Sequence, residues 1–279
     1  MALTVDTTTS QDNSTTSSST VTWTHVNHAD ADLIVVAIPC SQGDAAVSVT
    51  YNGDALTLAK KGTATDWSSG TSEIWYKVNP ATGSNTMVIT HTSSKAYYYG
   101  SAISFIGADT SDPIGADNSA TGDVQNKSVT LTTEQGDSYV VDCLASQGNV
   151  QTPDGSQTDF SAASGNRMCS YKDADTQGEN GTSWTAAASN NHILIIVEIR
   201  SATPPATGIN IQVNISDVWK EGSAAKINIG DDWKVVAGIQ QNISDSWKVI
   251  AAAKINISDD WKEVVGIQQN ISDTWKTVF

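Results

Sequence analysis

A tryptophan-containing repeat of 14 residues constrains the fold of this 279-residue chain more than any other feature. Each unit reads Asn-Ile-Ser/Gly-Asp-x-Trp-Lys, and the tryptophans fall at Trp219, Trp233, Trp247, Trp261 and Trp275. The isoleucines keep the same register, at Ile215, Ile229, Ile243, Ile257 and Ile271. Such strict self-similarity indicates an array of like structural units.

Each unit is predicted to be a strand, a tight turn and a second strand, because Ser/Gly-Asp separates two short alternating segments. In the copy that begins at Lys226, we expect the isoleucines to share a face with Trp233, and Asn228 and Lys234 to lie on the other face. An isolated two-stranded hairpin is marginally stable in water. We therefore expect neighbouring hairpins, in the same chain or in another copy, to cover the tryptophans.

Alternate units of the array differ, since Gln241 and Gln269 stand where the other units have Ile227 and Ile255. Either successive hairpins face different neighbours, or a 28-residue segment has been duplicated. The weaker apolar face of the alternate units suggests that another chain completes the array.

Residues 1–203 are predicted to form a β domain of their own. Apolar and polar residues alternate in segments such as "STVTWTHV" and "AVSVTY", which is typical of half-buried strands. The continuous apolar run "DLIVVAIPC" is typical of a strand buried on both faces. Turn signals such as Asn52-Gly53 separate about nine to eleven strands. Many short antiparallel strands favour a two-sheet β-sandwich with a jelly-roll-like topology.

The sequence "SATPPATG" interrupts the strand pattern, because Pro204-Pro205 cannot continue a sheet. We place a linker at residues 204–208 and five 14-residue β-hairpin repeats at residues 209–279. The predicted fold is therefore all-β: a jelly-roll-like sandwich followed by a hairpin repeat array.

The net charge of −15 is carried almost entirely by the first part of the chain. Up to Thr203 there are 21 acidic and 8 basic residues, a net −13, and the remaining 9 acidic and 7 basic residues leave −2. A surface with this negative charge repels phosphate backbones and anionic lipid headgroups. We therefore expect no nucleic-acid partner and no membrane insertion. The first residues lack a signal-peptide pattern, so we expect synthesis in a cytoplasm without the usual export.

Few residues point to chemistry. Cys40, Cys143 and Cys169 are odd in number and lie in strand-like surroundings, so we expect buried free thiols. A metal site at His25 and His28 is disfavoured, because a spacing of three puts them on opposite faces of a strand. The segment 107–123 is rich in oxygen ligands and is a candidate calcium site, with an ordinary polar loop as the alternative. No catalytic residue and no other cofactor is predicted.

Aromatic residues could form a platform for sugar. The candidates are Trp67, Tyr97, Tyr98 and Tyr99. Core packing is the favoured alternative for these side chains, because neighbouring residues in a strand point to opposite faces. The same alternative is favoured over ligand binding for the repeated tryptophans.

The stretch from Tyr51 to Gly115, "YNGDALTLAKK…SEIWYKVNPATGSNTMVIT…GSAISFIGADTSDPIG", resembles a β-sandwich domain common in structural proteins of tailed phages. The Trp-Lys hairpin array is similar to those that end many phage tail, fibre and decoration proteins. The resemblance implies a non-enzymatic virion protein that sits on the particle surface or tail and assembles in the host cytoplasm. Its implied partners are other virion proteins and further copies of itself, as a homo-oligomer such as a trimer or as a filament.

Three other functions remain open on the sequence. One is a carbohydrate-binding module or adhesin, viral or bacterial, whose ligand is a host-surface glycan. Another is a tail-associated polysaccharide depolymerase. A third is a subunit of an extracellular filament.

Overall fold

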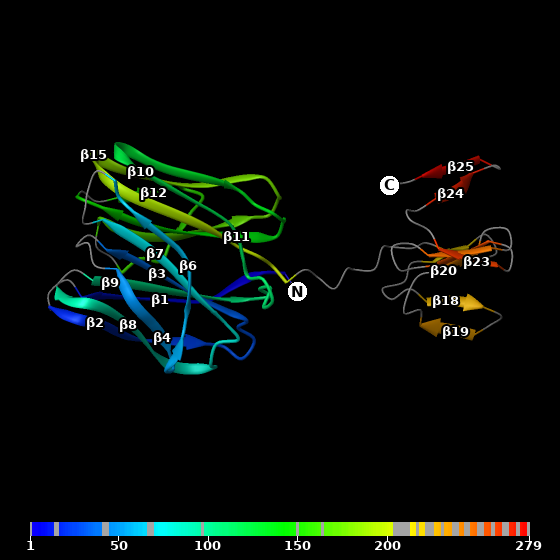
Figure 1. Ribbon diagram of the computed structural model, residues 1–279, viewed down its shortest axis with the longest axis horizontal. Coiled ribbons are helices and arrows are strands. Elements are labelled where there is room, and N and C mark those ends of the chain that lie inside the picture. The colour runs from blue at the N-terminus through cyan, green and yellow to red at the C-terminus, as the bar shows by residue number, and fades with distance from the viewer. Residues whose placement is uncertain are drawn as a thin grey trace. The chain divides into compact units, whose positions relative to one another are not determined.

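The computed structural model describes residues 2–13, 17–40, 45–65, 70–95, 98–148, 151–162 and 165–202, and ten short strands between Val213 and Thr277. These residues form strands and turns without a helix, which confirms the predicted all-β class, and none of them forms a helix able to cross a membrane. The chain divides into two compact units, Met1–Pro204 and Pro205–Phe279 (Figure 1). The predicted linker at 204–208 falls outside the described residues, apart from this division.

Nine strands make up the first half of unit 1: β1 (Thr4–Asn13), β2 (Ser18–Asn27), β3 (Leu33–Cys40), β4 (Ala46–Tyr51), β5 (Asp54–Ala55), β6 (Thr57–Thr63), β7 (Thr71–Val78), β8 (Gly83–Lys95) and β9 (Tyr98–Ile106). They form a central sheet in the order β1-β9-β3-β7-β6 and an outer sheet in the order β2-β8-β4-β5. The pairs β1–β9, β2–β8, β3–β7 and β4–β5 are nested, first strand with last and second with second-last. This nesting is the folded-ribbon order of a jelly roll, so the predicted topology is confirmed.

Local turn chemistry sets the hairpins of the jelly roll. Asn52 and Gly53 both have positive φ, at 53° and 83°, as the Asn-Gly turn signal predicts. Asn79 and Gly83, which flank the turn between β7 and β8, also have positive φ. The Asn52-Gly53 turn sets the register of β4 and β5, in which Tyr51 is opposite Asp54.

A third sheet distinguishes unit 1 from the two-sheet sandwich that the sequence predicts. Its strands are β10 (Ile114–Thr132), β11 (Ser138–Ser146), β12 (Gln151–Pro153), β13 (Thr158–Asp159), β14 (Arg167–Ala174) and β15 (Glu179–Ile199). The order is β10-β15-β11-β14-β13, and β12 also pairs with β15. Figure 1 shows the three sheets as layers, with the central sheet between the other two. The prediction of two sheets is therefore wrong.

The apolar residues of β3 explain why a third sheet is needed. Leu33, Val35 and Ala37 belong to the apolar cluster shared with the third sheet. Ile34 and Val36 belong to the cluster shared with the outer sheet. All eight residues of β3 are buried, which confirms the prediction of a strand buried on both faces. A two-sheet sandwich would have left one of these faces exposed to water.

The long strands β10 and β15 fold over the far face of the third sheet. Their register jumps from Val124 opposite Asn190 to Asn126 opposite Thr185, which marks the bend. The two arms of β10 then come together, because the side-chain amide of Asn118 donates to the carbonyl of Thr130 at 2.6 Å. The fold encloses a third apolar cluster, in which both arms of β15 take part.

Unit 2 contains five antiparallel strand pairs, one in each copy of the repeat. The strands are β16 (Val213–Ile215), β17 (Val218–Lys220), β18 (Lys226–Ile229), β19 (Asp232–Val235), β20 (Gln240–Asn242), β21 (Ser246–Val249), β22 (Lys254–Ile257), β23 (Asp260–Glu263), β24 (Gln268–Ile271) and β25 (Thr274–Thr277). Every pair joins consecutive strands, as the repeat predicts. We call these pairs the Trp-Lys hairpins.

The register of the Trp-Lys hairpins corrects the predicted faces. In all five copies the asparagine is the direct cross-strand partner of the tryptophan, as in Asn228 opposite Trp233. Ile227 is opposite Lys234 instead. Cross-strand partners occupy the same face, so tryptophan shares its face with asparagine and not with isoleucine. The prediction failed because alternation was carried through the turn, whereas pairing is set by the number of turn residues.

Two successive hairpins join in one sheet, in the order β20-β21-β22-β23. Strand β21 pairs with β22 of the next copy, with Lys248 opposite Ile255. A parallel bridge also relates Trp247 to Trp261. Repeat units of this chain can therefore extend one another's sheets through their backbones.

Candidate functional site

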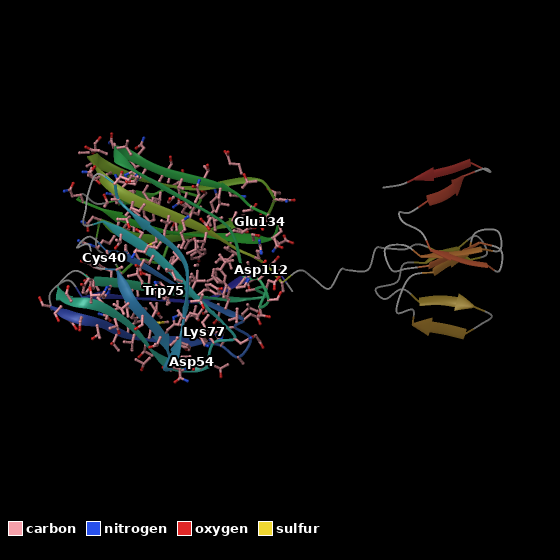
Figure 2. The ribbon with its side chains drawn as sticks, in the orientation of Figure 1. Cys40, Asp54, Trp75, Lys77, Asp112 and Glu134 are labelled. Carbon is pink, nitrogen blue, oxygen red and sulfur yellow. The ribbon has the colours of Figure 1, made fainter. Side chains whose placement is uncertain are left out.

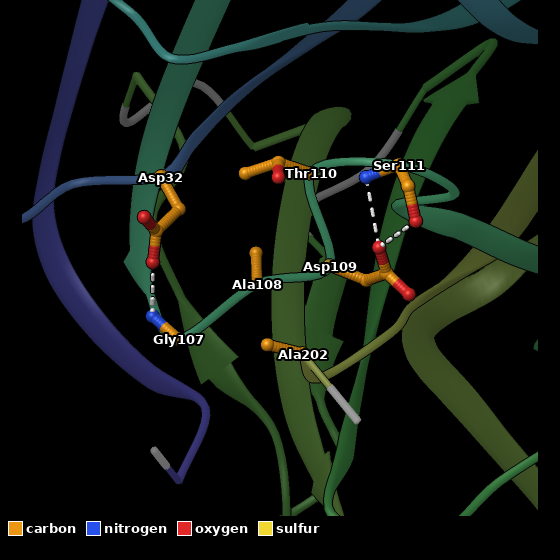
Figure 3. A pocket seen from close by; sticks show the side chains of 7 residues that line it. All are labelled: Asp32, Gly107, Ala108, Asp109, Thr110, Ser111 and Ala202. Atoms are coloured by element: carbon orange, nitrogen blue, oxygen red, sulfur yellow. Dashed lines mark hydrogen bonds between the residues drawn. The ribbon is translucent and has the colours of Figure 1, made fainter. Parts of the chain in front are cut away.

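Two hollows flank the segment 107–113, which connects the jelly roll to the third sheet. The first has a volume of about 420 Å³ and is lined by Asp32, Gly107, Ala108, Asp109, Thr110, Ser111 and Ala202 (Figure 3). The second has a volume of about 270 Å³ and is lined by Ala55, Thr57, Tyr76, Lys77, Val78, Thr110, Ser111 and Pro113. Thr110 and Ser111 line both hollows, so the segment separates them.

Backbone and carboxylate contacts hold this segment in place. Gly107 has a φ of 82°, and its N–H donates to the carboxylate of Asp32 at 2.6 Å. Its carbonyl accepts from the N–H of Ala202 at 2.6 Å, and the N–H of Asp109 donates to the carbonyl of Arg200 at 3.0 Å. A positive φ is accessible to glycine at little cost, which favours glycine at this turn.

The Asp109 carboxylate closes a local turn. Its Oδ1 accepts from the N–H of Ser111 at 2.8 Å, from the Ser111 hydroxyl at 2.6 Å and from the N–H of Asp112 at 3.1 Å. The Ser111 hydrogen bonds hold the pKa of Asp109 below its ordinary value. Asp109 therefore stays ionised and shapes the loop, which is a common use of aspartate in turns.

The predicted calcium segment is divided between this loop and a strand. Residues from Ile114 onward lie in β10, so the acidic side chains beyond that point do not belong to a loop. Asp117 forms an ion pair with Lys60, and Asp112 forms one with Arg200. Within the described residues no three His, Cys, Asp or Glu side chains gather in a way that could hold a metal ion. The candidate calcium segment, residues 107–123, therefore holds no such cluster of side chains.

Arg200 joins the loop to the third sheet. Its guanidinium pairs with the carboxylates of Asp112 and Glu134, which Figure 2 shows at the same end of unit 1. Beside it, the buried Glu198 accepts from the N–H groups of Ala116 and Glu134 and from the Ser138 hydroxyl. Buried polar groups need such partners, and these hydrogen bonds join β15 to β10 and to the residues just before and at the start of β11.

The second hollow is lined by both polar and apolar side chains. Tyr76 offers an aromatic ring, Thr57 and Ser111 offer hydroxyls, and Lys77 offers a cation that also approaches Asp54 at 3.5 Å. Its volume is slightly below the about 300–1,000 Å³ that is usual for ligand pockets, and Tyr76 also packs against the apolar cluster between the central and third sheets. The sequence does not single out Tyr76, because this residue alternates there like any other strand residue.

The predicted aromatic platform is corrected for two of its four residues. Tyr98 and Tyr99 are buried, and they contact His91 and Arg167 instead of solvent. The ring of Tyr98 stacks on His91 at 3.7 Å, and the guanidinium of Arg167 lies 4.8 Å from the centre of the Tyr99 ring. Core packing, the alternative to a platform, therefore describes both. Trp67 and Tyr97 lie outside the described residues.

The two neighbouring histidines are separated, as their spacing predicts. His25 is buried, with its Nδ1 at 2.7 Å from the Thr9 hydroxyl and its Nε2 at 3.3 Å from the Ser104 hydroxyl. His28 is exposed and pairs with Asp6. Burial lowers the pKa of His25 to about 4, so the ring is neutral at physiological pH.

An uncharged hydroxyl face covers the outside of the outer sheet. The alternation that buries Trp23 turns Thr22 outward, where it is directly opposite Val88. The face carries Thr20, Thr22, Thr24, Val26, Ser48, Thr50, Ser84, Thr86, Val88 and Thr90. None of these ten residues is ionisable, although this part of the chain has a net charge of −13. The alternating threonines of "STVTWTHV" would have predicted the face.

The predicted assembly residues lie in the Trp-Lys hairpins. All five tryptophans are strand residues with asparagine partners. Ile215, Ile229, Ile257 and Ile271 are strand residues as well. Ile243 lies outside the described residues. The described strands of unit 2 form open sheets of two or four strands, so each sheet has two edge strands.

Comparisons of the chain with protein-family models, with curated proteins and with solved structures found no match.

Proposed function

We propose that this chain is a non-enzymatic structural protein of a tailed-phage virion, as a surface fibre, a decoration protein or a tail appendage, and that it works as a homo-oligomer. One observation carries the proposal: the same Trp-Lys hairpin, with the same Asn–Trp register, occurs five times, and two of the copies share a sheet. Open edges of short paired strands are templates for further pairing, within the chain or between copies.

The architecture of unit 1 supports the proposal. Jelly rolls occur in viral capsid proteins, although the fold alone does not determine function. The acidic surface keeps copies apart by repulsion, whereas the hydroxyl face carries no charge. Copies can therefore approach one another at this face and through the hairpins with the least electrostatic cost. Trimers suit a fibre or spike, and a filament is the other arrangement of the same contacts.

Electron microscopy of the full-length protein tests this proposal. We expect multimers of regular shape in the purified protein, and we expect antibodies against residues 1–203 to label the surface or tail of released phage particles. Single-chain particles in the purified sample, with no labelling of virions, would contradict both parts of the proposal.

A carbohydrate-binding module or adhesin is the second candidate, and the hollow at Tyr76 is the observation that favours it. Binding on a glycan array that is lost in Tyr76→Ala and retained in Tyr76→Phe would support it, since only the first change removes the ring. Trp67→Ala and Tyr97→Ala test the two remaining aromatic candidates in the same assay. Binding equal to that of the wild type in all four variants would exclude a role for these rings.

A further inference from the structure

Two of the three cysteines are direct cross-strand partners. Strands β11 and β14 run antiparallel, and their register places Cys143 opposite Cys169. Neither residue is exposed, and both belong to the apolar cluster between the central and third sheets. Both thiols are free, as the sequence predicts. Because cross-strand partners share a face, the two thiol groups lie on the same side of the third sheet.

The backbone hydrogen bonds of Cys169 show whether Cys143 and Cys169 are a hydrogen-bonded or a non-hydrogen-bonded pair of the antiparallel ladder. Its N–H donates to the hydroxyl of Ser161 at 2.7 Å, and its carbonyl accepts from the N–H of Phe160 at 3.0 Å. Both backbone groups therefore point away from β11, so Cys143 and Cys169 form a non-hydrogen-bonded pair. Partners of this kind have Cα atoms about 4.5 Å apart. Disulfides span Cα distances of about 4.4–6.8 Å, so the pair needs no strand separation to be bridged.

The third cysteine is shielded from this pair. Cys40 lies at the end of β3 and belongs to the apolar cluster between the central and outer sheets. The central sheet therefore separates Cys40 from Cys143 and Cys169. In the folded protein, Cys143 and Cys169 can therefore form a disulfide only with each other, although three cysteines are present.

We propose that Cys143 and Cys169 are a disulfide site, which closes a cross-strand bond when the chain meets a low-molecular-weight disulfide such as oxidised glutathione. One cysteine thiolate attacks oxidised glutathione, forming a mixed disulfide and releasing one reduced glutathione. The second thiol loses its proton and displaces the second glutathione, so one S–S bond forms in the protein as one is reduced in the oxidant. This site does not depend on the proposed function.

Burial determines when the bond forms. Thiolates, not thiols, carry out exchange. Burial, reinforced by the neighbouring Cys143 thiol, raises the pKa of Cys169 well above its ordinary value. The folded dithiol therefore reacts slowly, and the bond forms during folding or local opening. Once formed, the disulfide is protected from reductants, because both cysteines are buried.

Refolding in a glutathione redox buffer tests the site. We expect the oxidised protein to be lighter than the reduced protein by two hydrogen atoms, to yield a cross-linked peptide that contains Cys143 and Cys169, and to retain one titratable thiol. The denaturant midpoint should rise on oxidation and return on reduction. The same mapping on protein expressed in cells with an oxidising cytoplasm needs no refolding step.

Matched variants separate this pair from general oxidation. Cys40→Ser should keep both the bond and the rise in midpoint, whereas Cys143→Ser and Cys169→Ser should lose both. Three titratable thiols in protein folded under oxidising conditions would overturn the proposal. A cross-link through Cys40 in the folded wild type would overturn it equally.

Discussion

The indole N–H of Trp184 donates a hydrogen bond to the carboxylate of Asp142 at 2.9 Å, and neither residue is exposed to solvent. The same carboxylate accepts from the N–H of Ser170 at 2.8 Å, from the Ser170 hydroxyl at 2.9 Å and from the side-chain amide of Gln157 at 3.3 Å. This network ties the folded-over arm of β15 to β11 and β14. Its donors satisfy the hydrogen-bonding capacity of a fully buried carboxyl group.

Removal of the indole donor should destabilise unit 1. We expect Trp184→Phe to lower the free energy of unfolding by about 2–4 kcal/mol, since a buried acceptor loses a partner and a void is left. Trp75→Phe is a matched control, because the Trp75 indole donates to Glu73 at 2.9 Å from a half-buried position. We expect a smaller loss for the control in urea unfolding. Equal losses of unfolding free energy in the two variants would show that the Trp184–Asp142 hydrogen bond contributes no more to stability than the Trp75–Glu73 hydrogen bond.

Titration of Asp142 should make stability fall as pH rises through a defined window. Burial raises the pKa of Asp142 from 3.8 to about 6. The folded state then binds the Asp142 proton more tightly than the unfolded state does. The contribution of Asp142 to the free energy of unfolding is therefore most favourable below pH 3.8 and is lost as pH rises through 6. The shift corresponds to about 3 kcal/mol.

Asp142→Asn removes this titration but places an amide among hydrogen-bond donors. We expect the variant to be less stable than the wild type at pH 4, and the gap to narrow by about 3 kcal/mol towards pH 7. Urea unfolding across this range measures the gap. A gap that stays constant with pH would contradict the shifted titration.

His25 should produce the opposite dependence. Burial lowers its pKa from 6.5 to about 4, so between these values the unfolded state binds the proton more readily. The contribution of His25 to stability therefore rises with pH from 4 to 6.5. We expect the advantage of the wild type over His25→Gln to grow by about 3 kcal/mol across this window, as measured by denaturant unfolding. If the stability advantage of the wild type over His25→Gln shrank as pH rises, the lowered pKa of His25 would be contradicted.

Close packing between β6 and β15 should make Gly62 intolerant of a side chain. A Cβ at Gly62 would lie 2.6 Å from the Ile195 side chain and 2.8 Å from that of Ile193. We expect Gly62→Ala to cost about 1–3 kcal/mol of unfolding free energy. Gly155→Ala is the control, because a Cβ there meets nothing within 4 Å. Comparable stability of the two variants would contradict the tight contact between the jelly roll and the third sheet.

The jelly roll could be predicted from the sequence because its signals are local. Alternation in "STVTWTHV" and the positive φ of Asn52 and Gly53 determine strands and a turn without reference to distant residues. The third sheet could not be predicted in the same way. Continuous apolar runs such as Leu33–Cys40 show that both faces of a strand are covered, but they do not show what covers them.

The candidate site was harder to predict than the fold. Tyr98, Tyr99 and Tyr76 look alike in the sequence, and only tertiary contacts bury the first two while Tyr76 lines a hollow. The faces of the hairpin residues were mispredicted for a related reason. Pairing of Asn228 with Trp233 depends on the number of turn residues, which apolar periodicity does not encode.

Light scattering coupled to size exclusion tests the role of the Trp-Lys hairpins in assembly most directly. The comparison is between the full chain and a chain that lacks residues 209–279. We predict that the full chain is an oligomer and that the shortened chain is a monomer with the cooperative unfolding of an intact β domain. The same number of copies in both samples would contradict assembly through the hairpins.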